Sequence, residues 1–269
     1  MKFSVLMSVY KAEKPKYLKK SLESIINQTL LPDEVVLVID GRLTPSLYRV
    51  IEEFQREYKI LKTYTFENNV MLGRALAQGL NLCSNEIVAR MDTDDIALPH
   101  RFERQYYYLM NNINISVVGC AIEEFNDQNT LNYKKYMPNN MREIRRYIKY
   151  RNPFNHMTVM FRKSDVLRVG NYRHFPLLED YDLWNRMLAK GYVFANIDDI
   201  LVKVRANDDR YAKRGGIQYF KQFTKLRVMQ YQLKILNKFE FVKSLFGTMV
   251  MTLVPNRGRE IAYRFLLRK

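Results

Sequence analysis

Short apolar runs alternate with stretches of helical periodicity over the first hundred residues of the chain. The runs at residues 3–9 and 34–39 are nearly continuous, as in strands that are covered on both faces, and further strands are predicted at residues 60–66 and 87–91. Between them apolar residues recur every three or four positions, which predicts helices at residues 17–29, 45–58 and 73–83. Alternating strands and helices are typical of an α/β fold with a mostly parallel central sheet flanked by helices.

The pattern continues more irregularly in the second half. Strands are predicted at residues 116–122 and 158–161, a basic helix at 141–151, and another helix that opens at 177–184. Helical periodicity returns at 219–236 and is followed by an apolar stretch at 241–254. We therefore divide the chain into one α/β domain at residues 1–204, with halves at 1–99 and 100–204, and a basic amphipathic helical tail at 205–269.

Composition narrows the class of protein. The 269 residues are 47% hydrophobic, which is enough to bury one substantial core, and the formal net charge of +16 favours an anionic partner. Cys83 and Cys120 lack metal-ligand or CxxC spacing, so we expect reduced thiols in a cytosolic protein. The first apolar run is too short for a signal peptide, and no run of about 18 apolar residues predicts a membrane-spanning helix.

Three carboxylates follow the predicted strand at 87–91. Asp92, Asp94 and Asp95 would repel one another at a strand end unless a cation joined them, and carboxylate oxygens suit a hard divalent ion. Two other polar clusters, at 8–10 and 40–41, also follow strands, and in parallel sheets such ends share one edge where ligands bind. The alternative is a solvated acidic turn that caps the next helix.

Glycine-rich phosphate loops are absent from the sequence. Neither G-x-G-x-x-G nor G-x-x-x-x-G-K-[ST] occurs, which argues against dinucleotide-binding and P-loop proteins. A phosphate bound without such a loop would need a metal ion, and the aspartates could hold one.

Seven motifs, in this order along the chain, resemble those of family 2 inverting glycosyltransferases, most of all the bacterial enzymes that build capsule, exopolysaccharide or lipopolysaccharide. They are SVLMSVY at 4–10, SLESIINQT at 21–29, VIDG at 38–41, NNVMLGRALAQGL at 68–80, MDTDD at 91–95, NPFNHMTVMFR at 152–162 and LEDYDLW at 178–184. The resemblance implies the nucleotide-diphospho-sugar transferase fold called GT-A, in agreement with the strand order.

The resemblance also implies a set of donor-binding residues: Ser8, Val9, Tyr10, Asp40, Asn69, Gly73, Arg74, Arg90, Asp92 and Thr93. Ser8 and Tyr10 would line the uracil and ribose pocket of a UDP-sugar, and Asp40 would accept a hydrogen bond from the uracil. The family often has two aspartates before the glycine, whereas this chain has Ile39 and Asp40. Arg74 or Arg90 would neutralise diphosphate charge, or either could be a solvated surface charge.

In the family's D-x-D element, formed here by Asp92, Thr93 and Asp94, the resemblance implies that Asp92 bonds ribose or sugar. Asp94, together with Asp92, would ligate Mn²⁺ or Mg²⁺, and Asp95 would help through water or cap the following helix. A divalent ion between carboxylates and diphosphate stabilises the negative charge that grows on the leaving group.

Inverting transfer needs one base on the acceptor side. By resemblance Asp180 is that base, and Glu179 orients it or bonds the donor sugar, although carboxylates are also favoured at a helix N-terminus. We expect Asp182 on the helix surface. His156 would orient an acceptor hydroxyl or the diphosphate, or serve structurally. Trp184 would stack on an acceptor sugar, or pack within the helix layer.

The tail is the most basic part of the chain. Residues 203–269 hold 16 lysines and arginines against four acidic residues, interleaved with apolar positions, which predicts an interfacial anchor on an anionic membrane. The alternative is a helical cover on the domain with a solvated basic face, and nucleic-acid binding is not favoured because no recognition motif accompanies the charge.

Taken together, these patterns predict a metal-dependent inverting hexosyltransferase that uses a UDP-sugar, with a weak preference for UDP-galactose. Its acceptor would be a lipid-linked glycan, and its location the cytoplasm, at the inner face of the plasma membrane. The alternatives are a nucleotidyltransferase that acts on a sugar phosphate and a non-catalytic basic module that binds membrane or nucleic acid.

Overall fold

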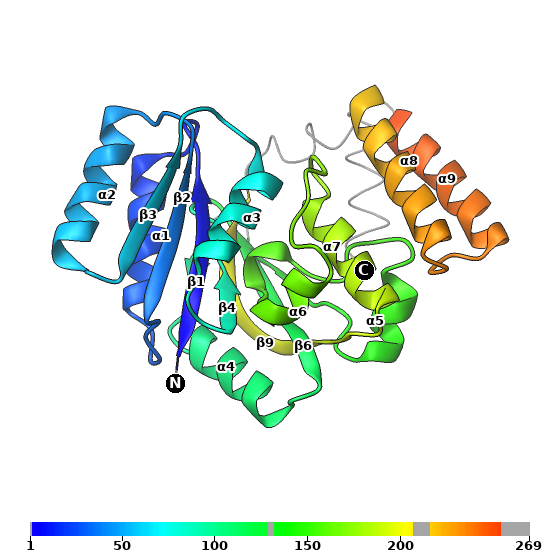
Figure 1. The fold of residues 1–269 in the computed structure, drawn as a ribbon, viewed down its shortest axis with the longest axis horizontal. Coiled ribbons are helices and arrows are strands. Elements are labelled where there is room, and N and C mark those ends of the chain that lie inside the picture. Colours follow the sequence, from blue (N-terminus) through cyan, green and yellow to red (C-terminus); the bar gives the residue numbers. More distant parts are fainter. Residues whose placement is uncertain (1, 129–131, 207–215, 254–269) are drawn as a thin grey trace.

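A mixed α/β sheet with helices on both faces forms the body of the computed structural model, which describes residues 2–128, 132–206 and 216–253 (Figure 1). In the described part nine strands form one sheet in the order β3-β2-β1-β4-β8-β6-β9-β5, with β7 paired to β6. The strands are β1 (Phe3–Val9), β2 (Glu34–Asp40), β3 (Leu61–Phe66), β4 (Ile87–Arg90), β5 (Ile96–Ala97), β6 (Ile115–Phe125), β7 (Asn132–Lys135), β8 (Met160–Arg162) and β9 (Val193–Arg205).

The first four strands are parallel, as the apolar runs predict. β1 lies between β2 and β4, and β2 pairs with β3, all in parallel register. The connecting helices are α1 (Pro15–Ile26), α2 (Pro45–Glu57) and α3 (Leu72–Leu82). Local signals set their starts, because Pro15 and Pro45 occupy first-turn positions and Thr44 accepts a hydrogen bond from the Leu47 N–H.

The second half mixes directions. Strand β6 runs parallel to β9 over a long ladder, whereas β8 inserts antiparallel between β4 and β6. Its helices are α4 (Arg101–Asn111), α5 (Met141–Tyr147), α6 (Lys163–Arg168) and α7 (Glu179–Ala189). The predicted strand at 158–161 begins too early, because His156–Thr158 form a 3₁₀ turn before β8.

Alternating side chains of the strands build two large cores, and a smaller third cluster lies between β6 and β9. Phe3, Val5 and Met7 of β1 face α1, α2 and α4, whereas Leu6 faces the layer that contains α3, α5, α6 and α7. The second core also includes Trp184. The two layers explain why the central strands read as continuous apolar runs.

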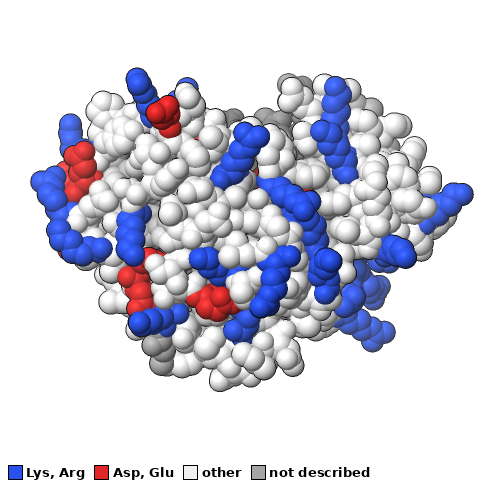
Figure 2. All heavy atoms as spheres, in the orientation of Figure 1, with Lys and Arg blue, Asp and Glu red and all other residues white. Residues whose placement is uncertain are grey.

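Two helices follow the sheet, α8 (Ile217–Gln232) and α9 (Lys238–Leu253), and they lie side by side at the far end of the molecule from α2 (Figure 1). Leu226 of α8 is buried in the core that contains α7, so this helix packs on the domain. Figure 2 shows mostly basic side chains on the half of this face that carries α5 to α9, and acidic ones chiefly over the other half. Among the described residues no helix is both long and apolar enough to cross a membrane. Tail residues 207–215 and 254–269 lie outside the described part.

Candidate active site

The carboxyl ends of the parallel strands meet at one edge of the sheet. Val9 pairs with Ile39 on β2, and Leu6 pairs with Arg90 on β4, so the chain leaves all three strands on the same side. The residues that follow are Tyr10, Asp40 itself at the end of β2, and the aspartate loop at 92–95. The predicted convergence of these clusters is therefore confirmed.

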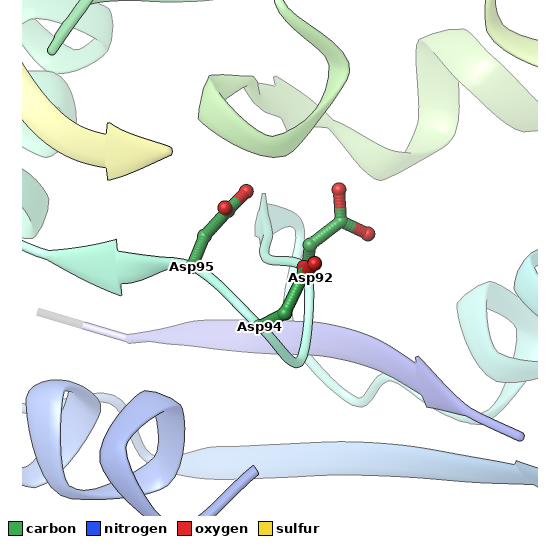
Figure 3. Close-up of side chains that lie close together, drawn as sticks. All are labelled: Asp92, Asp94 and Asp95. Carbon is green, nitrogen blue, oxygen red and sulfur yellow. The ribbon is translucent and has the colours of Figure 1, made fainter. Parts of the chain in front are cut away.

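Three aspartates project from the short loop between β4 and β5 (Figure 3). Each of Asp92, Asp94 and Asp95 offers a carboxylate oxygen, and these oxygens all lie within 4.8 Å of one another. Burial, together with the charges of Asp92 and Glu13, raises the pKa of Asp94 to about 7. Crowded, half-buried carboxylates of this kind gain from a proton or a cation between them.

Two arginines lie against this loop. The Nη1 of Arg90, whose side chain is buried, is 2.5 Å from a carboxylate oxygen of Asp92. The backbone N–H of Arg205 donates to Asp95 Oδ1 at 2.8 Å, and its Nε donates to the Asp94 carbonyl at 3.1 Å. The Arg205 guanidinium also pairs with Asp127, so the end of β9 braces the loop.

The donor atoms of this cluster fit a divalent ion. They are carboxylate oxygens, which Mg²⁺ and Mn²⁺ prefer, and they are close enough to share one ion. Burial is the main cause of the raised pKa of Asp94, and the charges of Asp92 and Glu13 add to it, so a bound cation would favour its charged form. Asp94 and Asp92 are the predicted ligands, and Asp95 stands with them.

The end of β2 forms a second polar point on the same edge. Asp40 is buried, and its carboxylate accepts hydrogen bonds from the Val70 N–H at 2.6 Å and the Asn69 amide at 3.0 Å. Burial raises its pKa. Predicted residues 40 and 69 are thus brought together, in a bond that fixes the loop before α3. Gly41 follows with φ of +84°, a conformation that glycine adopts without strain.

The remaining residues that were predicted to bind the donor differ in their exposure to solvent. Tyr10 is exposed and Ser8 is half-buried at the edge of the sheet. Val9 lies wholly in the core. The hydroxyl of buried Thr93 donates to Glu13 at 2.6 Å. Arg74 is exposed on α3.

Helix α3 and the segment before α7 are packed closely. A Cβ on Gly73 would lie 2.2 Å from the Arg173 carbonyl and 3.2 Å from the Glu179 Cβ, so only glycine permits this approach. Met71 and Leu177, just before the two helices, both have φ near +70°. Backbone strain of this kind is found at functional sites. Gly73 therefore lets the N-terminus of α7 pack against residues 1–99, the half that carries the predicted donor-binding residues and is called the donor half below.

A second pair of carboxylates stands at that N-terminus. Asp180 Oδ1 accepts the Tyr181 N–H at 2.7 Å, and its Oδ2 accepts the Asn152 amide at 2.5 Å. Both Glu179 and Asp180 are buried. Burial and the charge of Asp180 raise the pKa of Glu179 to about 7, and burial raises that of Asp180.

The two groups of carboxylates act on each other. The charge of Asp92 contributes to the raised pKa of Glu179, and the Arg90 guanidinium lowers the pKa of Glu179 and of Asp180. Arg90 is therefore the cation common to both groups. Such an arrangement can hold an anionic ligand and a proton acceptor within one site.

His156 is linked to Glu179 and Asp180 only indirectly, through Tyr172. Its Nε2 lies 3.1 Å from the Tyr172 hydroxyl, and burial lowers its pKa well below the usual range, so the ring is neutral. Burial raises the pKa of the Tyr172 hydroxyl, and the charges of Asp180 and Glu179 in turn contribute to the rise. The structure thus places His156 beside the predicted acceptor side, bonded to a tyrosine.

The structure decides two predictions about α7. Trp184 has no exposed surface and its ring packs edge-on against Phe154 and Phe194, so the packing alternative is confirmed and stacking on an acceptor sugar is wrong. The prediction for Asp182 is wrong, because it is not on the helix surface but buried, where it pairs with Arg186. The error arises because α7 is covered on nearly every side, which helical spacing alone does not reveal.

Sequence reasoning missed the residues that support the carboxylates. Arg205 and Glu13 reach the aspartate loop from β9 and from the turn after β1, and Asn152 reaches Asp180 from a loop. The family motif at 152–162 contains Asn152, which was the one available signal. The others lie at least 78 positions from their partners and carry no local pattern.

Comparison with known proteins gives a consistent result. The model of "Glycosyl transferase family 2" matches residues 4–170. The chain is 40% identical to "Amylovoran biosynthesis glycosyltransferase AmsE" of Erwinia amylovora, over 97% of each chain. It is 36% identical to "UDP-Gal:alpha-D-GlcNAc-diphosphoundecaprenol beta-1,3-galactosyltransferase" of Escherichia coli, over 100% of this chain and 97% of the relative.

The fold has solved counterparts as well. A structure of S. aureus TarS 1-349 in complex with UDP-GlcNAc superposes with a TM-score of 0.69 at 17% identity, covering 98% of this chain and 73% of that one. The expected GT-A architecture is confirmed.

Proposed function

The chain belongs to glycosyl transferase family 2, and from this premise we propose that it moves a hexose from a UDP-sugar to a glycan acceptor with inversion at the anomeric carbon. UDP-galactose is the favoured donor and a lipid-linked diphospho-sugar the favoured acceptor, because the name of the E. coli relative states both. The relatives named for amylovoran synthesis and for transfer to a diphosphoundecaprenol support a role in bacterial surface polysaccharide synthesis. Family membership favours this function over a nucleotidyltransferase or a non-catalytic basic module.

One observation carries the proposal: the charge of Arg90, which pairs with Asp92, also acts on Glu179 and Asp180. Asp92, Asp94 and Asp95 form one group on the donor half, and Glu179 and Asp180 form the other at the start of α7. A transferase that releases a nucleoside diphosphate needs both, one to hold a cation for the leaving group and one to take a proton.

In the proposed reaction Asp180 takes the proton from the acceptor hydroxyl while that oxygen bonds to the anomeric carbon. The bond from this carbon to UDP breaks, and its electron pair leaves with the diphosphate. Burial raises the pKa of Asp180, which makes it a better proton acceptor than an exposed aspartate. Glu179 orients Asp180 or bonds the donor sugar.

The donor half would hold the nucleotide. Ser8, Tyr10 and Asp40 stand at the strand ends where uridine is expected, and Asp92 would bond ribose or sugar. Asp94 and Asp92 would hold Mn²⁺ or Mg²⁺, which supplies positive charge to the departing diphosphate.

The test is a donor panel offered to the full chain with a synthetic diphospho-lipid that carries N-acetylglucosamine. Galactose transfer from UDP-galactose, loss of transfer in EDTA and recovery with Mn²⁺ are expected. NMR of the product should show a β-linkage from the α-configured donor. An α-linkage would disprove inversion, and transfer that persists in EDTA would disprove metal dependence.

We further propose that the tail holds the protein against an anionic membrane, at the inner face of the plasma membrane. Phe239, Val242, Phe246 and Met249 of α9 are 77%, 59%, 65% and 43% exposed and recur at three and four positions, so they form one apolar stripe. Lys238 and Lys243 on the same helix add positive charge. An apolar stripe with basic neighbours is typical of helices that lie in the lipid interface.

Vesicle sedimentation tests this part. Binding to phosphatidylglycerol vesicles and weaker binding to phosphatidylcholine vesicles are expected, and Phe239→Asp with Phe246→Asp should abolish both. Ile113→Asp, at an equally exposed apolar residue before β6, is the matched control and should bind like the unaltered protein. Unchanged binding of the double variant would contradict the assignment.

A further inference from the structure

Helix α8 lies beyond the residues that the family model matches, yet it buries polar side chains against the elements that carry Asn152 and Asp180. Arg227 and Gln230 are 4% and 0% exposed. A buried guanidinium and a buried amide cost free energy unless their hydrogen bonds are made, so their partners are informative.

Arg227 caps the end of α5. Its Nη1 donates to the Lys149 carbonyl at 2.7 Å and its Nη2 to the Tyr150 carbonyl at 2.9 Å. Gln230 Nε2 donates to the Ile148 carbonyl at 2.8 Å. Three successive carbonyls past the last turn of α5, which the helix itself cannot satisfy, are thus held by α8.

The same two side chains also reach α7. Gln230 Nε2 donates to the Asn185 Oδ1 at 2.9 Å, and Arg227 Nη1 lies 3.5 Å from the Tyr181 hydroxyl. Tyr181 donates through that hydroxyl to the Ile148 carbonyl at 2.6 Å. Segment 148–150 and helix α7 are therefore joined through α8 in one buried network.

Each of the two joined elements leads directly to one partner of a hydrogen bond in the site. Asn152 is two residues beyond the held carbonyls and donates to Asp180, which immediately precedes Tyr181. We infer that Arg227 and Gln230 are positioning residues for the reaction, because they fix the position of Asn152 relative to Asp180. This inference rests on the proposed role of Asp180.

The main test is Arg227→Met in the full chain, with Lys225→Met as the matched control, since Lys225 is an exposed cation on the same helix. A displacement near 1 Å at a reacting group costs about 100-fold in rate, so kcat of Arg227→Met should fall by about that factor. UDP affinity, measured by calorimetry, should stay unchanged. An unchanged kcat, or a matching loss of UDP affinity, would overturn the inference.

Two further readouts separate positioning from general support. The Asn152 hydrogen bond lowers the pKa of Asp180, so Asn152→Ala and Arg227→Met should both move the acidic limb of the kcat profile to higher pH. The double variant should be no slower than the slower single variant, because both changes act on one bond. Multiplied effects, or an unmoved acidic limb, would contradict the inference.

Asp180→Asn is assayed alongside. If it turns over, the proposed base is wrong. If it is inactive while Arg227→Met is unimpaired, only the positioning role fails. Should Arg227→Met not fold, Gln230→Met takes its place with the same expected fall in kcat, and an unchanged kcat there overturns the inference.

Discussion

The two groups of carboxylates are built in different ways, although both lie near Arg90. The aspartates at 92–95 come from one loop, and Arg90 and Arg205 bring positive charge or N–H groups to them. Glu179 and Asp180 begin a helix, are buried, and have no salt bridge among the residues that the structure describes. Asp180 accepts its hydrogen bonds from the Asn152 amide and from the Tyr181 backbone N–H.

This difference teaches that environment, more than residue type, decides what a carboxylate can do. Three carboxylates within 4.8 Å, partly offset by arginines, suit a shared divalent cation. Glu179 and Asp180, which have no ion pair among the described residues, hold a proton more readily than exposed carboxylates, since burial penalises the charged form, as it does for Asp94.

The largest expected effect comes from a substitution of Asp180. Asp180→Asn keeps the shape of the side chain but removes the proton acceptor, so kcat should fall by about 10³-fold while UDP affinity is unchanged. Steady-state kinetics and calorimetry measure the two quantities. Glu67→Gln, an exposed site after β3, is the control and should match the unaltered protein. Substantial turnover of Asp180→Asn would show that the pair does not act as the base.

Asp94→Ala tests the other group. Loss of one carboxylate from the loop should weaken Mn²⁺ binding and the Mn²⁺-dependent part of UDP affinity by about 100-fold, because the ion loses a charged ligand. Titration followed by electron paramagnetic resonance reports the free Mn²⁺ directly. UDP affinity in EDTA should not change. Equal Mn²⁺ affinity of Asp94→Ala and of the unaltered protein would show that this loop does not bind the metal.

Arg205→Ala tests whether the support of the aspartate loop matters for metal binding, since Arg205 holds the loop without being a metal ligand. Loss of the Nε bond to the Asp94 carbonyl and of the pair with Asp127 should weaken Mn²⁺ binding by about 10-fold. Arg104→Ala, whose arginine pairs with Asp199, is the control. An effect of the same size in both variants would point to general charge loss.

Glu179 should also affect the pH dependence of stability. Its pKa is raised from 4.5 to about 7, so the folded state keeps a proton that the unfolded state releases. The free energy of unfolding therefore falls as pH rises from about 4.5 to about 7, by an amount on the order of 3 kcal/mol from this group.

Glu179→Gln cannot titrate, so urea unfolding at several pH values should show a flatter dependence than in the unaltered protein. The two proteins should differ less at pH 5 than at pH 8, where the variant is relatively the more stable. Parallel curves would mean that the pKa of Glu179 is the same in the folded and the unfolded protein.

Much of the fold followed from local pattern. The pattern located the first four strands and the first three helices to within three residues, whereas β9 and α6 were not predicted. A strand covered on both faces is easy to locate because nearly every side chain must be apolar. The carboxyl ends of such strands share one edge, so Asp40 and the aspartates at 92–95 could be placed together before any coordinates were known.

The support for the site could not be found in this way. Asn152 bonds Asp180, Arg205 bonds Asp95 and Arg227 holds segment 148–150, from 28, 110 and 77–78 positions away. A hydrogen bond of this kind depends on which surfaces pack together, and no periodicity records it. The burial of Asp182 was hidden for the same reason.

The sequence by itself determined the α/β order, the family and the aspartates at the strand ends, because each depends on residues that are close along the chain. Only the tertiary structure decided which carboxylates share an arginine, which are buried, and which side chains hold them. Those outcomes depend on burial and on hydrogen bonds between distant segments, and both arise only when the layers pack.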